Sequence, residues 1–381
     1  MSHILRRSLP AMNTHWFQPA NEATLPSPAL LLFSERIDAN LRLMVEIAGD
    51  PARLRPHVKT HKLGPLIQRQ LALGITKFKC ATIAEAEMTA SAGAPDVLLS
   101  LPPVGPHIAR LAELVRAFPQ TRFATIADHA ATIRGLSAGA RAAGLTFEVF
   151  LDIDCGMHRT GVAPGEEAMA LYRLLCATPA LRPAGLHAYD GHLHQPDLAA
   201  RTAQCAADFA PVHALRQRLL SAGLPVPVLI AAGSPTFPCH AGLHPECELS
   251  PGTTVLWDFG YGDKFPDLAF QTAAVLLTRV VSKPGANRLC LDLGHKAVAS
   301  ENPHPRVRLL ELPDAVPVVH SEEHLVIETP RAAEFAIGAT LHGIPRHVCP
   351  TVALHSEAWL VAGGIARECW PILARARRIT V

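Results

Sequence analysis

From Ala29 to about Ala232, short apolar runs alternate with longer amphipathic stretches. The amphipathic stretches, such as Ile108–Ala117 and Ala131–Ala143, are rich in Ala, Leu and Arg and have helical spacing. The apolar runs predict eight strands, at Ala29–Phe33, Leu54–Val58, Lys77–Ala81, Val97–Leu101, Arg122–Ile126, Glu148–Ile153, Ala184–Ala188 and Val228–Ala232. Eight alternations of strand and helix predict an α/β fold of the (β/α)8 TIM barrel type.

The pattern changes after about Glu248, where helical spacing gives way to Val- and Leu-rich runs broken by Gly and Pro. These runs predict further strands at Ala273–Val281, Arg288–Leu291, Val307–Leu310, His324–Glu328 and Thr351–Leu354. We therefore expect a lead-in segment over residues 1–25, a barrel over residues 26–248 and a mainly β domain over residues 249–381.

Composition narrows the class of partner. The formal net charge of the 381 residues is +2 and no basic run stands out, which argues against nucleic acid or an anionic membrane and favours a small molecule. The nine cysteines include no C-x-x-C pair, as expected for free thiols in a reducing compartment. The first twenty residues lack the apolar run of a signal peptide, and no stretch reaches membrane-spanning length. We therefore expect a soluble, cytoplasmic protein.

The first candidate for chemistry is Lys59, at the end of the run Leu54-Arg55-Pro56-His57-Val58-Lys59-Thr60-His61-Lys62. A lysine at the carboxyl end of a barrel strand lies where such barrels place their chemistry. An amine that is partly removed from water between cationic neighbours is pushed toward the neutral form, which bonds covalently to aldehydes. The ordinary alternative is a solvated surface lysine.

Two loops late in the barrel predict a phosphate site. Ala232-Gly233-Ser234-Pro235-Thr236 follows the expected eighth strand, and Ser250-Pro251-Gly252-Thr253-Thr254 comes shortly afterwards. Backbone N–H groups exposed at glycine, together with hydroxyl side chains, bind phosphate, and the late-strand loops are its usual place in a barrel. Each loop alone would also be explained as a plain turn.

Two further strand ends carry ionisable residues. The segment Asp152–Val162 turns at glycine and presents Arg159, a permanently charged donor able to hold a phenolate or a carboxylate, or else to pair with an aspartate of its own loop. The segment Leu186–His194 carries Tyr189, which is suited to face a ring nitrogen, and His192, a candidate acid or base.

A candidate metal site lies near the end of the chain, in Pro345-Arg346-His347-Val348-Cys349-Pro350. Residues two apart in an extended segment point the same way, so His347 and Cys349 would both reach one ion. An imidazole and a thiolate favour zinc over magnesium or calcium, and two protein ligands leave positions for water and substrate. The alternative is a buried cysteine beside a surface histidine.

Taken together and in this order, these motifs resemble the fold-type III pyridoxal-phosphate enzymes, in particular the D-threonine aldolase and D-serine dehydratase family. The likeness runs from about Pro28 to Trp370 and is most specific in four segments, Pro56–Lys62, Asp154–Gly161, Gly233–Thr236 and His347–Thr351. It implies an alanine racemase-like fold, and a homodimer in which the β domain of one subunit completes the active site of the other.

The resemblance also implies a role for each candidate. Lys59 would bond covalently to the aldehyde of pyridoxal 5'-phosphate, Arg159 would approach its phenolic oxygen, and Tyr189 would face its ring nitrogen. The phosphate would be held by Gly233, Ser234, Gly252 and Thr253. A divalent metal, zinc or manganese, would be bound by His347 and Cys349.

Two reactions of a D-β-hydroxy-α-amino acid fit such a site. If a base, for which His192 is our candidate, removes the hydroxyl proton, the Cα–Cβ bond breaks and leaves glycine and an aldehyde. If Lys59 removes the Cα proton instead, the hydroxyl leaves and the products are a keto acid and ammonia, as in a D-serine or D-threo-3-hydroxyaspartate dehydratase. The Tyr-Asp-Gly-His sequence at Tyr189 favours the aldolase.

Three other functions are less well supported. A racemase that uses a tyrosine of the β domain as second base is disfavoured, because no tyrosine follows Tyr261. A pyridoxal-phosphate carrier without turnover would have no use for a β domain and a metal pair. A metal-dependent barrel hydrolase would need several His or Asp ligands at strand ends, and no H-x-H occurs at an early strand.

Overall fold

The computed structural model describes residues 16–381 of the chain, which form two compact units. One unit, the β unit, contains the residues up to Leu41 and Thr253–Ile372; the other, the barrel unit, contains Arg42–Gly252 and Leu373–Val381. The first fifteen residues of the expected lead-in lie outside the described part. The division differs from the expected boundaries in three places, because residues 26–41 belong to the β unit, whereas residues 249–252 and the last nine residues belong to the barrel unit.

The barrel unit is built on a curled parallel sheet of seven strands in the order β2-β3-β4-β5-β6-β7-β8. Isolated parallel bridges from Leu54 to Leu249 on β8 and from His57 to Lys79 on β2 join the two edges of the sheet. The barrel therefore closes with eight strand positions, seven taken by β2 to β8 and one by the bridging segment at Leu54 and His57. The strands are β2 (Lys77–Cys80), β3 (Asp96–Leu99), β4 (Arg122–Ala127), β5 (Phe147–Ile153), β6 (Leu181–Ala188), β7 (Val228–Ala231) and β8 (Cys247–Leu249).

The barrel was predicted correctly as a class, but two strand assignments were wrong. Ala29–Phe33 forms β1 of the β unit, because all five of its side chains are buried and a continuous apolar run does not indicate which sheet it joins. Cys247–Leu249 takes the remaining barrel position and was not predicted. The expected strand Leu54–Val58 makes only the two bridges, since Pro56 has no N–H to donate.

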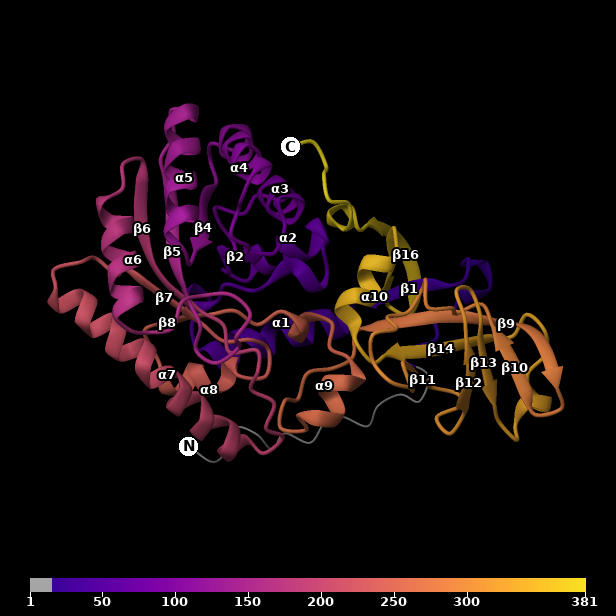
Figure 1. The fold of residues 1–381 in the computed structure, drawn as a ribbon. Helices are drawn as coiled ribbons and strands as arrows, with labels where there is room; N and C mark the ends of the chain where they lie inside the picture. Colours follow the sequence, from indigo (N-terminus) through magenta and orange to yellow (C-terminus); the bar gives the residue numbers. More distant parts are fainter. Residues whose placement is uncertain (1–15) are drawn as a thin grey trace. The chain divides into compact units, whose positions relative to one another are not determined.

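Helices connect consecutive strands of the barrel unit, and Figure 1 shows α3, α5 and α6 beside the strands that they pack against. α1 begins in the β unit, because the boundary at Leu41 falls inside it. The helices are α1 (Ser34–Ala48), α2 (Gly64–Ala72), α3 (Ile83–Ser91), α4 (Pro106–Ala117), α5 (Ala130–Ala143), α6 (Glu166–Ala177), α7 (Leu198–Ser221) and α8 (Phe237–Leu243), with short 3-10 turns η2 (Pro51–Arg53), η3 (Val58–Thr60) and η6 (Leu373–Arg375).

The amino ends of the barrel strands are tied together by buried charges. Arg55, which is 1% exposed, donates to Glu248 at 2.7 Å and to Asp96 at 2.5 Å, and Lys77 also pairs with Glu248. Breaking such a buried network by removing one partner costs on the order of 3–5 kcal/mol. This end of the barrel therefore serves stability and leaves the carboxyl ends of the strands for chemistry.

The β unit is built around a nine-stranded sheet whose main path is β12-β13-β10-β9-β1-β15-β16, with β14 paired to both β9 and β11. Its core contains Phe17, Leu31 and Val275, among other apolar residues. The elements are β1 (Ala29–Phe33), β9 (Ala274–Gly285), β10 (Arg288–Leu291), β11 (Val307–Leu309), β12 (Val316–His320), β13 (Leu325–Glu328), β14 (Thr340–Pro345), β15 (Glu357–Ala362), β16 (Ile365–Pro371), α9 (Phe259–Lys264), α10 (Val348–Leu354), η1 (Glu22–Thr24), η4 (Thr253–Val255) and η5 (Ala332–Glu334).

A mainly β second unit was predicted, but one of its expected strands is a helix. Thr351–Leu354 lies in α10, which begins directly after His347. Four apolar residues are too few to distinguish a buried strand from a helical turn by periodicity. Among residues 16–381 no helix combines the length and apolar character needed to cross a bilayer.

Candidate functional site

The carboxyl ends of the barrel strands surround a cavity of about 390 Å³. That volume is in the range of sites for small molecules and cofactors. Its walls contain six ionisable side chains from different strand ends and loops, together with a tyrosine and apolar residues. The polar lining comprises His57, Lys59, Lys79, Ser100, Asp152, Arg159, Thr160, His187 and Tyr189.

Lys59 reaches this cavity from η3, a single 3-10 turn capped by His57. The His57 ring accepts a hydrogen bond from the Lys59 N–H at 3.4 Å, and the His57 N–H donates to Pro251 O at 2.8 Å. Burial, together with the charges of Lys59 and Lys79, holds the pKa of His57 well below its usual value, so its ring is neutral. The short turn thus fixes the backbone of Lys59 and leaves the amine in the cavity wall.

Tyr189 and Arg159 lie in the same wall as Lys59. The Tyr189 ring centre is 5.9 Å from Lys59 Nζ and 5.1 Å from Arg159 Cζ. A Cβ at Gly191 would collide with the Tyr189 ring, and a Cβ at Gly233 would lie 3.0 Å from it, so both glycines make room for the aromatic side chain. The structure therefore brings together the three residues that were predicted to bind the cofactor ring.

Asp152 and His187 form a buried pair on neighbouring strands of the cavity floor. Asp152 Oδ1 lies 2.6 Å from His187 Nδ1, and Thr160 donates to Asp152 Oδ2 at 2.9 Å. His187 Nε2 has no hydrogen-bond partner among the described residues. Burial and the charge of Lys79 lower the pKa of His187, so a neutral ring presents one unpartnered nitrogen inside the barrel.

Sequence reasoning missed four of the cavity residues, His57, Lys79, Asp152 and His187. Lys79 lies inside a run that was interpreted only as a strand, and His187 lies in a segment noted for its ionisable residues but was given no role. A usable signal was present, because a charged or polar residue within an otherwise apolar barrel strand must either be paired or face a site.

The predicted phosphate loops meet within the barrel unit, but their glycine N–H groups are used inside the protein. Gly233 N donates to Asp190 Oδ1 at 3.1 Å and to Thr236 Oγ1 at 3.0 Å, and Gly252 N donates to Ser234 Oγ at 3.0 Å. The buried hydroxyl of Ser250 has no partner among the described residues. Thr253 lies just beyond the boundary, in the β unit, with Oγ1 3.5 Å from Cys349 Sγ.

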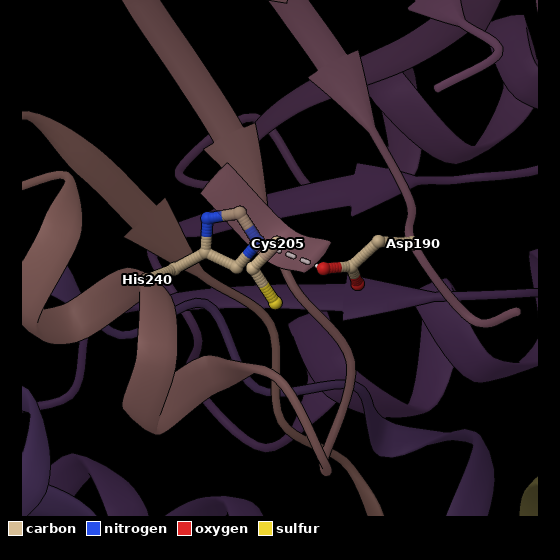
Figure 2. Close-up of side chains that lie close together, drawn as sticks. All are labelled: Asp190, Cys205 and His240. Carbon is tan, nitrogen blue, oxygen red and sulfur yellow. Dashed lines mark hydrogen bonds and ion pairs between the residues drawn. The ribbon is translucent and has the colours of Figure 1, made fainter. Parts of the chain in front are cut away.

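A buried cluster of Asp190, Cys205 and His240 supports the first of these loops (Figure 2). Asp190 Oδ2 lies 2.7 Å from His240 Nε2, while Thr236 Oγ1 donates to Asp190 Oδ1 at 2.7 Å. Burial acts to raise the pKa of Asp190, but the bonds from His240 and Thr236 outweigh it and hold that pKa below its usual value. The Asp190 carboxylate is thus ionised, and both of its oxygens are occupied by donors of the loop and of α8.

His192, the candidate base, lies outside the cavity lining. Its Nε2 is 2.9 Å from Asp208 Oδ2 on α7, and its Nδ1 is buried without a partner among the described residues. A Cβ at Gly156 would lie 2.6 Å from His192 Nε2, so the ring packs against the loop that carries Arg159. The structure therefore places His192 beside the cavity-forming loops, behind the lining itself.

His347 and Cys349 lie together at the start of α10, although not for the predicted reason. His347 is the extended N-cap residue (φ −133°, ψ 105°) and Cys349 is in the first helical turn, so the bend at the cap brings the side chains together. His347 Nδ1 lies 2.5 Å from Glu301 Oε1. Burial lowers the pKa of His347, but hydrogen bonds to Cys349 and Glu301 outweigh this and raise it to about 9.

Comparison with known families finds two matches that divide the chain near the boundary of the two units. The family described as "Alanine racemase, N-terminal domain" matches residues 34–257, and the family described as "Putative serine dehydratase domain" matches residues 273–361.

Individual relatives match over almost the whole chain. D-threonine aldolase of Arthrobacter sp is 31% identical over 93% of this chain and 93% of its own length. 3-Hydroxy-D-aspartate aldolase of Paracoccus denitrificans is 28% identical over 94% of each. D-threo-3-hydroxyaspartate dehydratase of Delftia sp. is 26% identical over 91% of this chain and 97% of its own length.

Solved structures are also similar to this chain over almost its whole length. The crystal structure of D-threonine aldolase from Filomicrobium marinum superimposes with a TM-score of 0.85 at 30% identity, covering 94% of this chain and 97% of its own. The Delftia dehydratase superimposes with a TM-score of 0.81 at 25% identity, covering 92% and 98%. Variants of that dehydratase with a histidine or a cysteine replaced by alanine are also similar, and the cysteine variant is described as metal-free.

Proposed function

This chain belongs to the family defined by the alanine racemase N-terminal domain, and on that premise we propose that it is a lyase of D-β-hydroxy-α-amino acids that depends on pyridoxal 5'-phosphate and a divalent metal. The principal reaction proposed is the retro-aldol cleavage of D-threonine-like substrates to glycine and an aldehyde. The observation that carries the proposal is the meeting of Lys59, Arg159 and Tyr189 in one cavity at the carboxyl ends of parallel strands.

The cavity fits the cofactor in size and in polar groups. In the cavity lining, His187 Nε2 is a buried polar atom without a protein partner among the described residues, and Ser250 Oγ, in the second predicted phosphate loop, is another, as expected where a polar ligand completes the bonding. We propose that Lys59 bonds to the cofactor aldehyde, Arg159 holds its phenolic oxygen, and Tyr189 faces its ring nitrogen. Gly233, Ser234, Gly252 and Thr253 are the proposed phosphate-binding residues. When bound, the cofactor supplies an electron sink for the pair released at Cα.

The residues at the start of α10 fit a divalent transition metal. Because Glu301 engages His347 Nδ1, the other ring nitrogen is left for the ion, which is the usual arrangement of a carboxylate behind a metal-binding histidine. The histidine and cysteine substituted in the Delftia dehydratase are two positions apart, as His347 and Cys349 are here. Nitrogen and sulfur donors favour zinc, and manganese is the second candidate.

The proposed base lies beside the cavity-forming loops, outside the lining itself. We propose that His192 accepts the proton of the substrate hydroxyl, since Asp208 orients its ring and Gly156 lets that ring approach the Arg159 loop. In the alternative dehydratase reaction Lys59 removes the Cα proton, and the product is a keto acid with ammonia. The relatives include both kinds of enzyme, so the second reaction is the main competing candidate.

The test is an assay of the holoprotein with D- and L-threonine, serine and 3-hydroxyaspartate, measuring glycine and aldehyde separately from keto acid and ammonia. We expect glycine and aldehyde from D-substrates only, with zinc or manganese required. A visible absorption band of the bound cofactor, trapped on Lys59 by borohydride and absent from Lys59→Ala, identifies the anchoring residue. Keto acid as the sole product would replace the aldolase by the dehydratase.

Two further properties belong to the same proposal. We propose a homodimer, to be measured by light scattering of the eluted holoprotein. We also propose a cytoplasmic location, in agreement with the free state of all nine cysteines. A monomer with full activity would contradict the first proposal.

A further inference from the structure

Lys79 is a second amine in the cavity wall, and the proposed reaction gives it no role. It lies on β2, one residue before the strand ends, and is 3% exposed. Its backbone N–H donates to Pro56 O at 2.9 Å, which holds it beside the segment leading to Lys59. Its side chain reaches the same cavity as Lys59 and Arg159.

Among residues 16–381 no carboxylate forms an ion pair with the Lys79 amine, and no hydrogen bond of the amine is found. It lies over the Tyr189 ring, whose centre is 5.4 Å from Nζ. Buried lysine amines are nearly always paired, because an unpaired charge removed from water is costly. A buried amine that faces a cavity without a partner therefore indicates a ligand.

Charged and titratable groups from every neighbouring element face Lys79. They are the cations Lys59 and Arg159, the carboxylates Asp152 and Asp190, and the imidazoles His57 and His187. Both carboxylates are already engaged, since Asp152 pairs with His187 and Thr160 while Asp190 pairs with His240 and Thr236. The carboxylates that act on this amine within the described part of the chain are thus both bonded to other groups.

Burial, together with the charge of Lys59, lowers the pKa of Lys79 to about 7. An amine with such a pKa is close to half protonated near neutral pH, so it can take a proton from solvent when an anion arrives. The lowered pKa agrees with the position of the amine, which by itself places a donor without a hydrogen-bond partner at the cavity.

We propose that Lys79 is an oxyanion-binding subsite of this cavity and donates to a phenolate or carboxylate oxygen of the bound cofactor and substrate. The inference rests on the proposed function and deepens it. The oxygen that accepts the hydrogen bond belongs either to the phenolic group of the cofactor or to a carboxylate of the substrate. In either case the neutral fraction of the amine takes up a proton from solvent as the anion binds, and no other covalent bond is made or broken.

The experiment compares Lys79→Met, which keeps the length but loses the charge, with Lys79→Arg, which keeps a charge. Lys77→Met is the matched control, because Lys77 lies on the same strand outside the cavity lining and pairs with Glu248. Two dissociation constants are measured for each protein: that of pyridoxal 5'-phosphate for the apoprotein, by absorbance titration, and that of D-malate for the holoprotein. Malate is a hydroxy acid without the amine needed to react.

The two sources give different results. If Lys79 serves the cofactor oxygen, Lys79→Met weakens pyridoxal 5'-phosphate binding by roughly tenfold or more and leaves malate binding unchanged. If it serves the substrate carboxylate, malate binding weakens by a similar factor and cofactor binding does not. Lys79→Arg should retain part of the lost affinity, and Lys77→Met should match the unmodified protein in both constants.

Proton uptake gives a second readout that is independent of activity. The ligand whose binding is weakened by Lys79→Met is titrated by calorimetry in buffers of different ionisation enthalpy. The unmodified protein should take up a fraction of a proton at pH 7.5 when it binds this ligand, and Lys79→Met should take up less. The proposal would be overturned if Lys79→Met bound each of the two ligands with the same affinity as the unmodified protein, within about twofold. Since this comparison is made only on protein that already shows the cofactor band, a missing band would contradict the proposed function instead.

Discussion

His240 and Asp190 form a fully buried pair, 2.7 Å apart, directly behind the loop that begins at Gly233. Through this pair α8 is joined to the end of β6, and the Gly233 N–H is held by the same carboxylate. The loop predicted to bind phosphate is thus held in shape by a buried carboxylate and an imidazole.

Removing the carboxylate should therefore disturb both stability and cofactor binding. Asp190→Ala leaves His240 Nε2 without its partner and removes one of the two acceptors of the Gly233 N–H, and we expect a loss of about 3–5 kcal/mol in the free energy of unfolding. Urea unfolding measures this loss, and absorbance titration measures the weaker binding of pyridoxal 5'-phosphate. Asp197→Ala, which removes only the N-cap of α7, is the control and should cost about 1 kcal/mol. Equal losses in the two variants would contradict the role given to Asp190.

The Tyr189 ring depends on a glycine two residues away. Gly191→Ala places a Cβ against the ring, which must move out of the cavity wall, so cofactor affinity should fall at least tenfold with a smaller effect on folding. The measurement is the dissociation constant of pyridoxal 5'-phosphate. Gly242→Ala, on α8 in open space, should leave that constant unchanged and be neutral or slightly stabilising. An unaltered constant in Gly191→Ala would show that the ring position is unimportant.

The orientation of His347 should depend on Glu301. Glu301→Gln removes the carboxylate that holds His347 Nδ1, and we expect the affinity for zinc or manganese to fall by roughly 10- to 100-fold. Metal content after dialysis against a buffered metal series measures this change. Glu322→Gln, which alters an exposed pair with Lys296, serves as the control and should bind metal like the unmodified protein. Full metal affinity in Glu301→Gln would rule out the supporting role.

The buried amine of Lys79 should make stability depend on pH. Its pKa is about 7 in the folded protein and near 10.5 when exposed, so between these values the unfolded chain binds more protons and stability rises with pH. Lys79→Met removes this term and should be more stable at pH 7 than the unmodified apoprotein, by up to a few kcal/mol. The difference should shrink toward pH 10, as followed by urea unfolding across that range. If the difference in the free energy of unfolding between the two proteins did not change with pH, the pKa of the Lys79 amine would not be lowered by burial.

The sequence alone was sufficient for the barrel and the second β unit. It also singled out Lys59, Arg159 and Tyr189, which meet in one cavity, and His347 and Cys349, which lie together at the start of α10. Periodicity reports burial, and burial repeats at each strand of a closed sheet, so the class of fold can be read from it. Motif residues at strand ends could be predicted to meet, because all parallel strands of a barrel point their carboxyl ends to the same side.

Tertiary structure alone decided which sheet each strand joined and which polar residues faced inward. β1 pairs with β15, more than three hundred residues later, and nothing local to Ala29–Phe33 indicates this partner. Lys79 and His187 became visible as cavity residues only through their burial and position, and Asp190 as the support of the Gly233 loop only through its partners. Hydrogen bonds and charges act over a few ångströms in space regardless of separation along the chain, whereas a sequence pattern records only near neighbours.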